Sequence, residues 1–311
     1  MKAFTVLVLL LVLLHPVDAE TSPPGPSIGL EIRGAAELQG EGEPRFDAPD
    51  VLGALEAAYP HRVDAVRWMD GDWTVEVAGT RFFWAGGRLL PEQARGEADR
   101  YDPYPFYRYE PGPPEYPVYT DAERAALDRL VAERDSDPQR RHPGFMNALW
   151  RISDQRSAYA RQKTTFFLGM KTMIHRELLE DLAAVEEAIV ERSRTDSALA
   201  RFLEELRSIE GYNYRRVDRT AVLSNHAYGI AVDFLPAYYG GRQVYWRWAY
   251  DSGLDWHSLA ERDRFEIPRA FVEAFERRGF VWGGKWRFFD IIHFEYRPEI
   301  LLLNGFELER H

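Results

Sequence analysis

Two short segments, residues 224–233 and residues 282–295, constrain the fold of this 311-residue chain more than any other part of it. The first reads SNHAYGIAVD and the second reads WGGKWRFFDIIHFE. Both place histidine and acidic side chains among glycines, small residues and aromatics. Both also contain alternating apolar and polar or small residues, and this period of two predicts β-strands with one buried face.

The strand predicted in the first segment runs through Asp233. Its apolar residues occupy alternate positions, so the carboxylate of Asp233 is expected on the opposite face. Gly229 allows the backbone to turn just before the strand, so that His226 can fold back over it. Ser224 is placed to hydrogen-bond either a ligand or the turn. Taken alone, His226 and Asp233 could equally be a structural histidine and a turn aspartate.

The second segment predicts a strand over residues 290–296, introduced by a turn at residues 283–284. His293 and Glu295 then share one face of that strand. Strict alternation would put Asp290 on the other face. We therefore expect Asp290 at the start of the strand, before the pleat is established.

The composition excludes several kinds of chemistry. The chain has no cysteine, which rules out disulfides, cysteine nucleophiles, thiolate metal sites and iron–sulfur clusters. Any metal must therefore be held by His, Asp and Glu. The formal charge is −11 and no basic stripe is present, which argues against nucleic acid and anionic membrane surfaces as partners.

The first part of the chain reads as an export signal and a lead-in. In residues 1–19, a lysine precedes a short apolar run that ends in small residues, the pattern of a secretory signal peptide. The run is too short to span a membrane, so we expect an exported protein, periplasmic or secreted, with no membrane span after cleavage. Residues 20–47 are rich in Pro and Gly and are expected to form a flexible lead-in.

Residues 48–95 predict a small α/β accessory module, made of a short helix followed by three strands with hairpin turns between them. The strands are expected at residues 66–68, 73–77 and 81–84. One interpretation is a cell-wall or substrate-binding accessory, and the other is a packing extension of the main domain. The second is favoured, because no chemically active residues cluster there. Residues 96–119, dense in Tyr and Pro, predict an extended strap that cannot be helical.

Residues 120–311 predict one domain, with a motif core at residues 210–300. The expected fold class is α+β, with several helices packed on a small, mainly antiparallel sheet that carries a mononuclear metal site. Helices are predicted from a capping box at Thr120, over residues 170–192, over residues 199–209, and from Pro268 to Gly279. His175 stands alone on the second of these helices and is interpreted as a surface or packing residue.

The two segments carry a resemblance in fixed positions that recur in order, namely Ser-x-His-x-x-Gly-x-Ala-x-Asp and then Asp-x-x-His-Phe-Glu. These are Ser224, His226, Gly229, Ala231 and Asp233, followed by Asp290, His293, Phe294 and Glu295. The pattern resembles the M15 family of zinc peptidases, which cut peptidoglycan stem peptides. The resemblance covers roughly residues 210–300 and says nothing of the module at residues 48–95.

The resemblance implies that His226, Asp233 and His293 bind Zn²⁺ and that Asp290 is the general base. Two neutral imidazoles and one carboxylate leave the ion with net positive charge, which suits the activation of water. Glu295 could orient a ligand imidazole or the strand, and Trp286 could form a wall of the site.

The family also uses an arginine upstream of the first block. Arg215, Arg216 and Arg219 are the candidates in this sequence, and the spacing to Ser224 favours Arg215. Each of the three could also be an ordinary surface arginine.

The resemblance therefore implies an exported zinc-dependent peptidase whose partners are peptidoglycan peptides. An aspartate at the base position is typical of the branch that cuts L-Ala-D-Glu bonds, so an endopeptidase is the first hypothesis. A D-alanyl-D-alanine carboxypeptidase is the alternative, and a non-catalytic, zinc-stabilised binding domain is the second alternative. The sequence indicates no oligomeric state.

Overall fold

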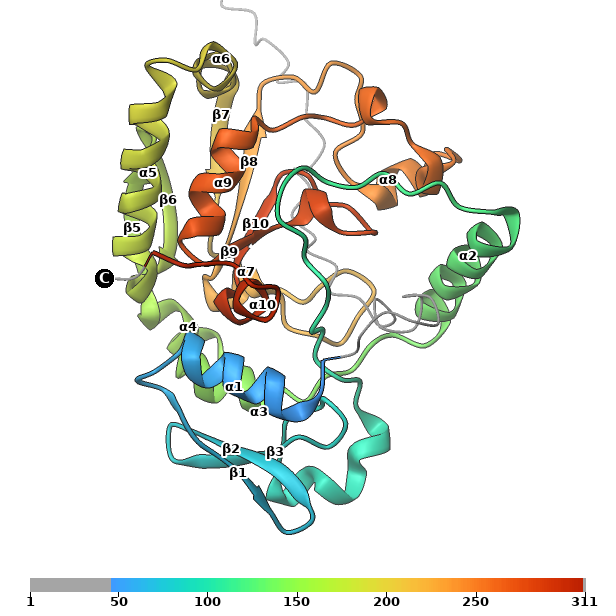
Figure 1. Ribbon diagram of the computed structural model, residues 1–311, viewed down its shortest axis with the longest axis vertical. Coiled ribbons are helices and arrows are strands. Elements are labelled where there is room, and N and C mark those ends of the chain that lie inside the picture. The colour runs from blue at the N-terminus through green and yellow to red at the C-terminus, as the bar shows by residue number, and fades with distance from the viewer. Residues whose placement is uncertain (1–45, 310–311) are drawn as a thin grey trace, which may run out of the picture.

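The structure, a computed structural model, describes residues 46–309. The predicted signal peptide, residues 1–19, lies outside the described residues, as does most of the 20–47 lead-in. The described chain combines helices with three small antiparallel sheets, which confirms the predicted α+β class. Figure 1 shows a larger body built around the central sheet and a smaller unit, formed by the first part of the described chain, below it.

Four antiparallel strands form the central sheet in the order β7-β8-β10-β9. Their bounds are β7 Leu206–Glu210, β8 Ala231–Pro236, β9 Phe280–Trp282 and β10 His293–Tyr296. The first sequence segment supplies β8 and the second supplies β10. Because β8 and β10 are neighbours in the sheet, these two distant segments lie side by side.

One face of the central sheet packs against helix α9 (Arg269–Arg277) through phenylalanines. The ring of Phe234 lies 4.9 Å from that of Phe271, and the ring of Phe275 lies 4.6 Å from that of Phe294. All four side chains are fully buried. Since successive side chains alternate across a strand, this packing leaves Asp233 on the other face, where the functional groups gather.

Residues 162–175 form a hairpin, so the helix predicted over residues 170–192 was wrong in its first part. Strands β5 (Gln162–Phe167) and β6 (Met170–His175) pair antiparallel. The turn residues Leu168 and Gly169 both have positive φ, 49° and 73°, which suits the twist of a two-residue hairpin. Cross-strand pairing therefore outweighs the local helical spacing, and helix α5 (Leu179–Ser193) begins only after a 3-10 turn, η2 (Arg176–Leu178).

The helix predicted over residues 199–209 was wrong in its last part. Helix α6 (Ser197–Glu205) ends where β7 begins. The pairing of β7 with β8 shifts between Leu206 and Ser208, so Arg207 is the extra residue of a β-bulge. The bulge places the buried side chains of Leu206 and Ile209 three residues apart, a spacing that resembles a helix in the sequence.

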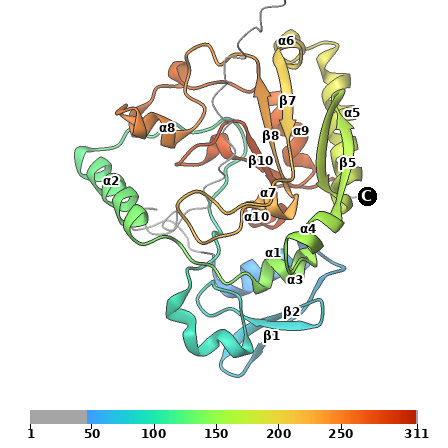
Figure 2. The same ribbon diagram turned by 180° about the vertical axis from the view of Figure 1, so that it is seen from behind.

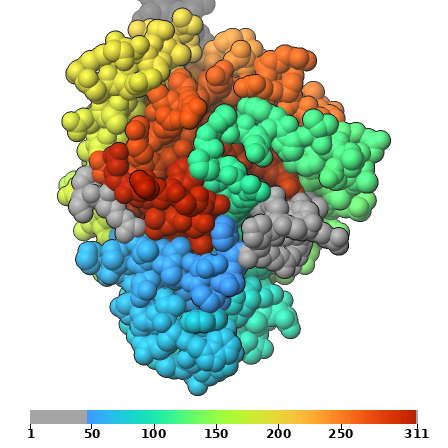
Figure 3. Space-filling view, viewed as in Figure 1, coloured from blue at the N-terminus to red at the C-terminus, as the bar shows by residue number. Residues whose placement is uncertain are grey.

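The N-terminal unit contains the predicted helix and three strands, with a short fourth strand and a 3-10 segment after them. The bounds are α1 Ala48–Ala58, β1 Val63–Met69, β2 Asp72–Val77, β3 Thr80–Phe83, β4 Leu90–Pro91 and η1 Glu92–Arg100. The strands form one antiparallel sheet in sequence order. Figure 3 shows this unit, in blue, in direct contact with the C-terminal segments, in red.

The N-terminal unit shares its hydrophobic core with the rest of the molecule. Helix α1 packs against α10 (Pro298–Leu303), and Leu55 belongs to the same buried cluster as Trp150 and Phe294. The ring of Tyr59 meets that of Trp150 edge-on, at 6.0 Å. A shared core of this kind means that the unit stabilises the main body by burial of apolar surface.

The Tyr/Pro-rich strap was predicted over residues 96–119, but residues 96–100 belong to the 3-10 segment η1, so its first part was wrong. Residues 101–119 contain neither helix nor strand, as their prolines predict. In Figure 1 the strap crosses in front of β9 and the segment before β10. The hydroxyl of Tyr109 donates to Glu276 at 2.6 Å and accepts from the backbone of Trp282 at 2.9 Å. The backbone N–H of Tyr109 donates to Asn304 at 2.9 Å. The strap is therefore fixed to the C-terminal part of the chain by buried hydrogen bonds.

The remaining helices are short, apart from α2 (Asp121–Ser136), whose predicted capping box between Thr120 and Glu123 is present. They are α3 Gly144–Trp150, α4 Gln155–Arg161, α7 Asn225–Tyr228 and α8 Trp246–Asp251, with 3-10 turns η3 Trp256–Ser258, η4 Glu261–Asp263 and η5 Gly283–Lys285. Within residues 46–309, none of the helices has the length and apolar character needed to cross a bilayer.

Candidate metal centre

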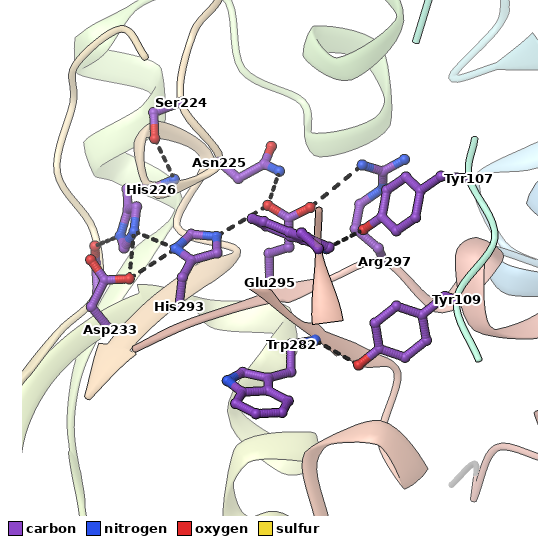
Figure 4. Close-up of polar contacts among 12 residues, drawn as sticks. Tyr107, Tyr109, Ser224, Asn225, His226, Asp233, Trp282, His293, Glu295 and Arg297 are labelled. Carbon is purple, nitrogen blue, oxygen red and sulfur yellow. Dashed lines mark hydrogen bonds and ion pairs between the residues drawn. The ribbon is translucent and has the colours of Figure 1, made fainter. Parts of the chain in front are cut away.

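Three buried side chains converge on the polar face of the central sheet. His226 Nε2 lies 3.2 Å from Asp233 Oδ1 and 3.3 Å from His293 Nδ1. His293 Nδ1 lies 2.8 Å from the same Asp233 oxygen. Among the described residues, these three form the one group whose ligand atoms all lie within 4.8 Å of one another and could hold a metal ion. Figure 4 shows the three side chains pointing toward a common centre.

The local fold explains why these residues meet. Asp233 and His293 face each other directly in the register of β8 and β10. His226 lies on the one-turn helix α7, where the hydroxyl of Ser224 accepts a hydrogen bond from its backbone N–H at 3.3 Å. Gly229 ends that turn with φ 72°, and a Cβ there would collide with the side chain of Gln162. Ser224 and Gly229 thus hold the backbone that presents His226.

The hydrogen bonds of the two imidazoles turn their free nitrogens inward. His226 Nδ1 lies 2.6 Å from the carbonyl oxygen of Gly211, and a carbonyl can only accept, so this nitrogen carries the proton. His293 Nε2 lies 3.2 Å from Glu295 Oε2 and donates to it. The opposite nitrogen of each ring, Nε2 of His226 and Nδ1 of His293, is left to act as a metal ligand.

Glu295 is part of a buried polar chain that extends away from the centre. Its Oε2 accepts from Asn225 Nδ2 at 2.7 Å, and its Oε1 lies 3.6 Å from the guanidinium of Arg297. Arg297 also pairs with Glu299, which accepts a hydrogen bond from Tyr59 at 2.9 Å. The sequence analysis missed Asn225 and Arg297. The sequence did contain a signal for Arg297. In Glu295-x-Arg297-x-Glu299, charged residues of opposite sign alternate at positions that share one face of a strand.

The predicted base, Asp290, lies just before β10, which begins at His293, as expected from the alternation in the sequence. Its backbone pairs with Tyr245 across an isolated bridge. The side chain is 1% exposed, and neither carboxylate oxygen has a hydrogen-bond partner within the described part of the chain. Burial raises the pKa of Asp290 well above its ordinary value. Burying two acceptor atoms without hydrogen-bond donors costs free energy, unless a ligand or a water molecule donates to them.

Of the three candidate arginines, Arg215 is the one on which the charges of Asp233 and Asp290 act. Burial lowers its pKa, and the nearby charges of Asp233 and Asp290 oppose that shift. Its Nε and Nη2 atoms have no hydrogen-bond partner among residues 46–309. Arg216 donates to the carbonyl of Ala221, and Arg219 pairs with Asp135 at 3.0 Å. Those two arginines are engaged elsewhere.

Trp286 lies beside the centre and connects it to the strap. Its ring is 5.5 Å from that of His293, and its Nε1 donates to the hydroxyl of Tyr107 at 2.9 Å. The position against His293 is that of a wall residue, as the sequence analysis proposed. The contact with Tyr107 was not visible in the sequence, because the strap is almost two hundred residues upstream.

The charges and hydrogen bonds of the three central side chains shift the pKa values of Asp233 and His293. Burial raises the pKa of Asp233, but the hydrogen bonds and charges of His226 and His293 outweigh it and lower that pKa to about 2. Burial lowers the pKa of His293, but its hydrogen bonds to Asp233 and Glu295 raise it to about 10. Asp233 is therefore ionised over the whole physiological range.

Two further polar residues near the centre escaped the sequence analysis. Glu210, the last residue of β7, faces Asp233 across the sheet, and its pKa is raised by burial and by the charge of Asp233. Tyr239 follows β8, and burial and the charges of Asp233 and Asp290 raise its pKa. Neither residue belongs to a motif. The pairing of β7 with β8 brings Glu210 to the site, and Tyr239 reaches it from the loop after β8.

The donor set fits a zinc ion. Two imidazole nitrogens and one carboxylate are the ligands that zinc takes in catalytic sites, where a fourth position stays open. The second oxygen of Asp233 has no hydrogen-bond partner in the described residues, so it too is available at the centre. Both histidines carry the outer hydrogen bonds that fix the ring orientation of metal ligands.

A buried cluster of metal ligands beside an ionisable carboxylate is the arrangement of a metal-dependent hydrolase. A family model described as D-alanyl-D-alanine carboxypeptidase matches residues 218–296, the segment that carries the three ligands and Asp290. The match supports the M15 family and a peptidase for this segment of the chain. M15 peptidases are generally zinc-dependent, and the His226–Asp233–His293 cluster is where such an ion would bind.

The match to the peptidase family does not extend beyond residues 218–296. Residues 51–106 match a family described only as a domain of unknown function. No curated protein and no solved structure matches the chain. Arg215 lies three residues before the start of the peptidase match.

Proposed function

We propose that this protein is an exported, zinc-dependent peptidase that hydrolyses peptidoglycan stem peptides, with the L-Ala-D-Glu bond as its target. One observation carries the proposal: three ligand atoms converge beside a buried carboxylate, Asp290, that has no partner of its own among the described residues. Export rests on the signal-peptide pattern of residues 1–19, which lie outside the described residues.

His226, Asp233 and His293 would hold the zinc ion. When bound, zinc would lower the pKa of water and polarise the scissile carbonyl. Glu295 fixes the proton of His293 on Nε2, and the Gly211 carbonyl fixes that of His226 on Nδ1. These outer hydrogen bonds turn the other nitrogen of each ring toward the centre, which is the orientation that a metal ligand needs.

Asp290 would act as the general base and then as the general acid. Both carboxylate oxygens are free to accept the proton of the attacking water and to pass it to the leaving amine. Burial raises the pKa of Asp290, which makes its carboxylate a stronger base. Arg215 would stabilise the negative charge that develops on the carbonyl oxygen, through donors that no carboxylate in the described chain occupies.

A D-alanyl-D-alanine carboxypeptidase is the second candidate. The description of the matching family favours it. So does Arg215, because a carboxypeptidase needs a fixed cation for the terminal carboxylate of its substrate, and the charges of Asp233 and Asp290 act on the guanidinium of Arg215.

Mass spectrometry of muropeptides after digestion separates these hypotheses. Separation of the stem between L-Ala and D-Glu means an endopeptidase, and loss of a single alanine mass means a carboxypeptidase. Unchanged muropeptides in the presence of a bound equivalent of zinc would leave only a zinc-stabilised binding domain, and would overturn the proposed activity. A parallel digestion with the Asp290→Asn protein controls for contaminating hydrolases.

A further inference from the structure

Trp286, the residue that follows η5, is held in place by three contacts beside the metal centre. Its ring lies 5.5 Å from the imidazole of His293. Gly283 packs closely against the ring, because a Cβ added there would lie 3.1 Å from two of its carbons. The indole Nε1 donates to the hydroxyl of Tyr107 at 2.9 Å, and the two rings meet edge-on with 6.4 Å between their centroids. Trp286 is still partly exposed, so part of the residue remains open to solvent next to the centre.

Tyr107 belongs to a part of the strap that is anchored by other bonds. The side chain of Asn304 bonds two strap residues: its Nδ2 donates to the carbonyl of Tyr107 at 3.0 Å, and its Oδ1 accepts from the backbone N–H of Tyr109 at 2.9 Å. Lys285 Nζ donates to the carbonyl of Glu110 at 2.9 Å. Figure 4 shows the rings of Tyr107 and Tyr109 projecting from the strap toward the strands of the centre. None of these bonds uses the hydroxyl of Tyr107, so the strap is fixed without it.

The contact between Tyr107 and Trp286 joins a segment outside both family matches to the peptidase segment. Trp286 lies within residues 218–296, which match the peptidase family, whereas Tyr107 lies just after residues 51–106, which match the domain of unknown function. Figure 1 shows the strap in front of the segment before β10, and Figure 2, from the opposite side, shows it behind that segment. The strap therefore adds a residue to the surroundings of the centre that neither family description covers.

We propose that Tyr107 is a positioning residue for substrate binding: its hydroxyl holds the indole of Trp286 as a wall against which the bound peptide packs. This inference rests on the proposed function, because it concerns how a peptide substrate is held beside the metal centre. An aromatic side chain buries a large apolar area when a ligand packs against it. Such a contact is present in both the bound substrate and the transition state, so it lowers KM and leaves kcat unchanged. The strap thereby contributes to substrate binding without touching the reacting atoms.

Tyr107→Phe removes the hydroxyl and keeps the ring. Losing one uncharged hydrogen bond should raise KM for muropeptide hydrolysis about 2- to 10-fold, with kcat within about twofold of the wild type. Tyr104→Phe is the matched control, because it is the same substitution in the same strap and removes a 2.7 Å hydrogen bond to the carbonyl of His142. It should leave KM unchanged. An unchanged KM in Tyr107→Phe would overturn the proposal, and so would a lower kcat at unchanged KM, which would mean that Trp286 acts through His293.

A double substitution tests whether Tyr107 acts through the indole. Trp286→Phe keeps an aromatic ring in the wall but has no N–H to donate. In this background Tyr107→Phe should change KM no further, because two residues that act by one contact have non-additive effects. A further rise in KM equal to that in the wild-type background would show that Tyr107 acts by another route, and it would refute the positioning role.

Nuclear magnetic resonance of the ¹⁵N-labelled protein tests the contact without substrate. Trp286→Phe identifies the indole N–H signal of Trp286 by its loss. A hydrogen bond slows the exchange of this proton with water, so exchange should be at least about tenfold faster in Tyr107→Phe and unchanged in Tyr104→Phe. Equal exchange in the wild type and in Tyr107→Phe would refute the positioning role alone. A wild-type protein that leaves muropeptides uncut would instead refute the proposed function, and with it the role of the wall in substrate binding.

Discussion

The hydroxyl of Tyr59 donates a 2.9 Å hydrogen bond to Glu299, a residue 240 positions further along the chain. Both groups are buried. Through Arg297 and Glu295, this bond connects the N-terminal unit to the imidazole of His293. Figure 4 shows the part of this connection from Arg297 to His293. The unit at residues 48–100 therefore supports the residues behind the metal centre.

Tyr59→Phe removes this hydrogen bond and keeps the ring. Because a carboxylate then loses a buried donor, we expect the free energy of unfolding to fall by about 1.5–3 kcal/mol. Urea denaturation measures the change. Tyr238→Phe, at a side chain 75% exposed, is the matched control and should cost nothing measurable. Equal stability of both variants would mean that the bond contributes nothing.

Glu295→Gln keeps the shape of the side chain but removes the charge that holds the His293 proton on Nε2. We expect zinc affinity to fall about 10- to 100-fold, the usual cost of changing a ligand's outer partner. Competition with a chelator measures the affinity. Exposed Glu187 provides the control substitution Glu187→Gln. An unchanged zinc affinity in Glu295→Gln would show that this carboxylate is not required to orient the imidazole of His293.

Asp290→Asn tests the base. The amide cannot take a proton from water, so kcat should drop by about 10²- to 10⁴-fold. Asp290 is not among the three converging ligands, so the zinc content should stay at one equivalent by mass spectrometry of the native protein. Full activity in this variant would transfer the role of base to another group, such as Glu210.

Gly229 and Gly169 have almost the same backbone angle, φ 72° and φ 73°, but different surroundings. An added Cβ meets open space at Gly169 and the Gln162 side chain at Gly229. We expect Gly169→Ala to cost about 1–2 kcal/mol, the penalty of the left-handed conformation alone. Gly229→Ala should cost more and also weaken zinc binding, since it displaces the turn that carries His226. Comparable losses in the two variants would contradict this.

His175 makes stability depend on pH. It is buried against Trp150, and burial together with nearby arginines lowers its pKa to about 3, below the ordinary 6.5. The unfolded chain therefore binds a proton between these values that the folded chain does not, so stability decreases as the pH falls below 6.5. From pH 7 to pH 5 this histidine should cost about 2 kcal/mol. Urea denaturation of the wild type and of His175→Gln at both pH values measures it, and an identical pH dependence in the two proteins would refute the assignment.

The sequence was sufficient to identify the residues that form the centre, because its signal is local. Alternation predicted the faces of β8 and β10, and it also explained why Asp290 precedes its strand. The spacing to Ser224 favoured Arg215 but left Arg216 and Arg219 open, since the side chains of Arg215 and Arg216 differ only in the face of one extended segment. In the structure the charges of Asp233 and Asp290 act on Arg215, whereas Arg216 and Arg219 bond to other groups.

The errors in the predicted elements have a common cause. Residues 170–175 and 206–209 contain apolar side chains at helical spacing, yet both are strands. In the second case a bulge produces the spacing, and in the first the pairing partner lies in β5, a separate segment that was not predicted as a strand. Strand pairing depends on a distant segment, so a local pattern cannot reveal it. The same holds for Arg297, Glu210 and Tyr239, which reach the site only through tertiary contacts.

The position of the strap has a consequence for the order of assembly. Tyr109 bonds to the backbone of Trp282, 173 residues away, and Arg297 reaches the carbonyl of Pro105, 192 residues away. Contacts between such distant residues form late in folding, because a long loop must close first. His293 also belongs to the last strand of the chain. A growing chain therefore has two of the three ligands before it has the third, and the strap can close only after its partners, Trp282 and Arg297, have been added to the chain.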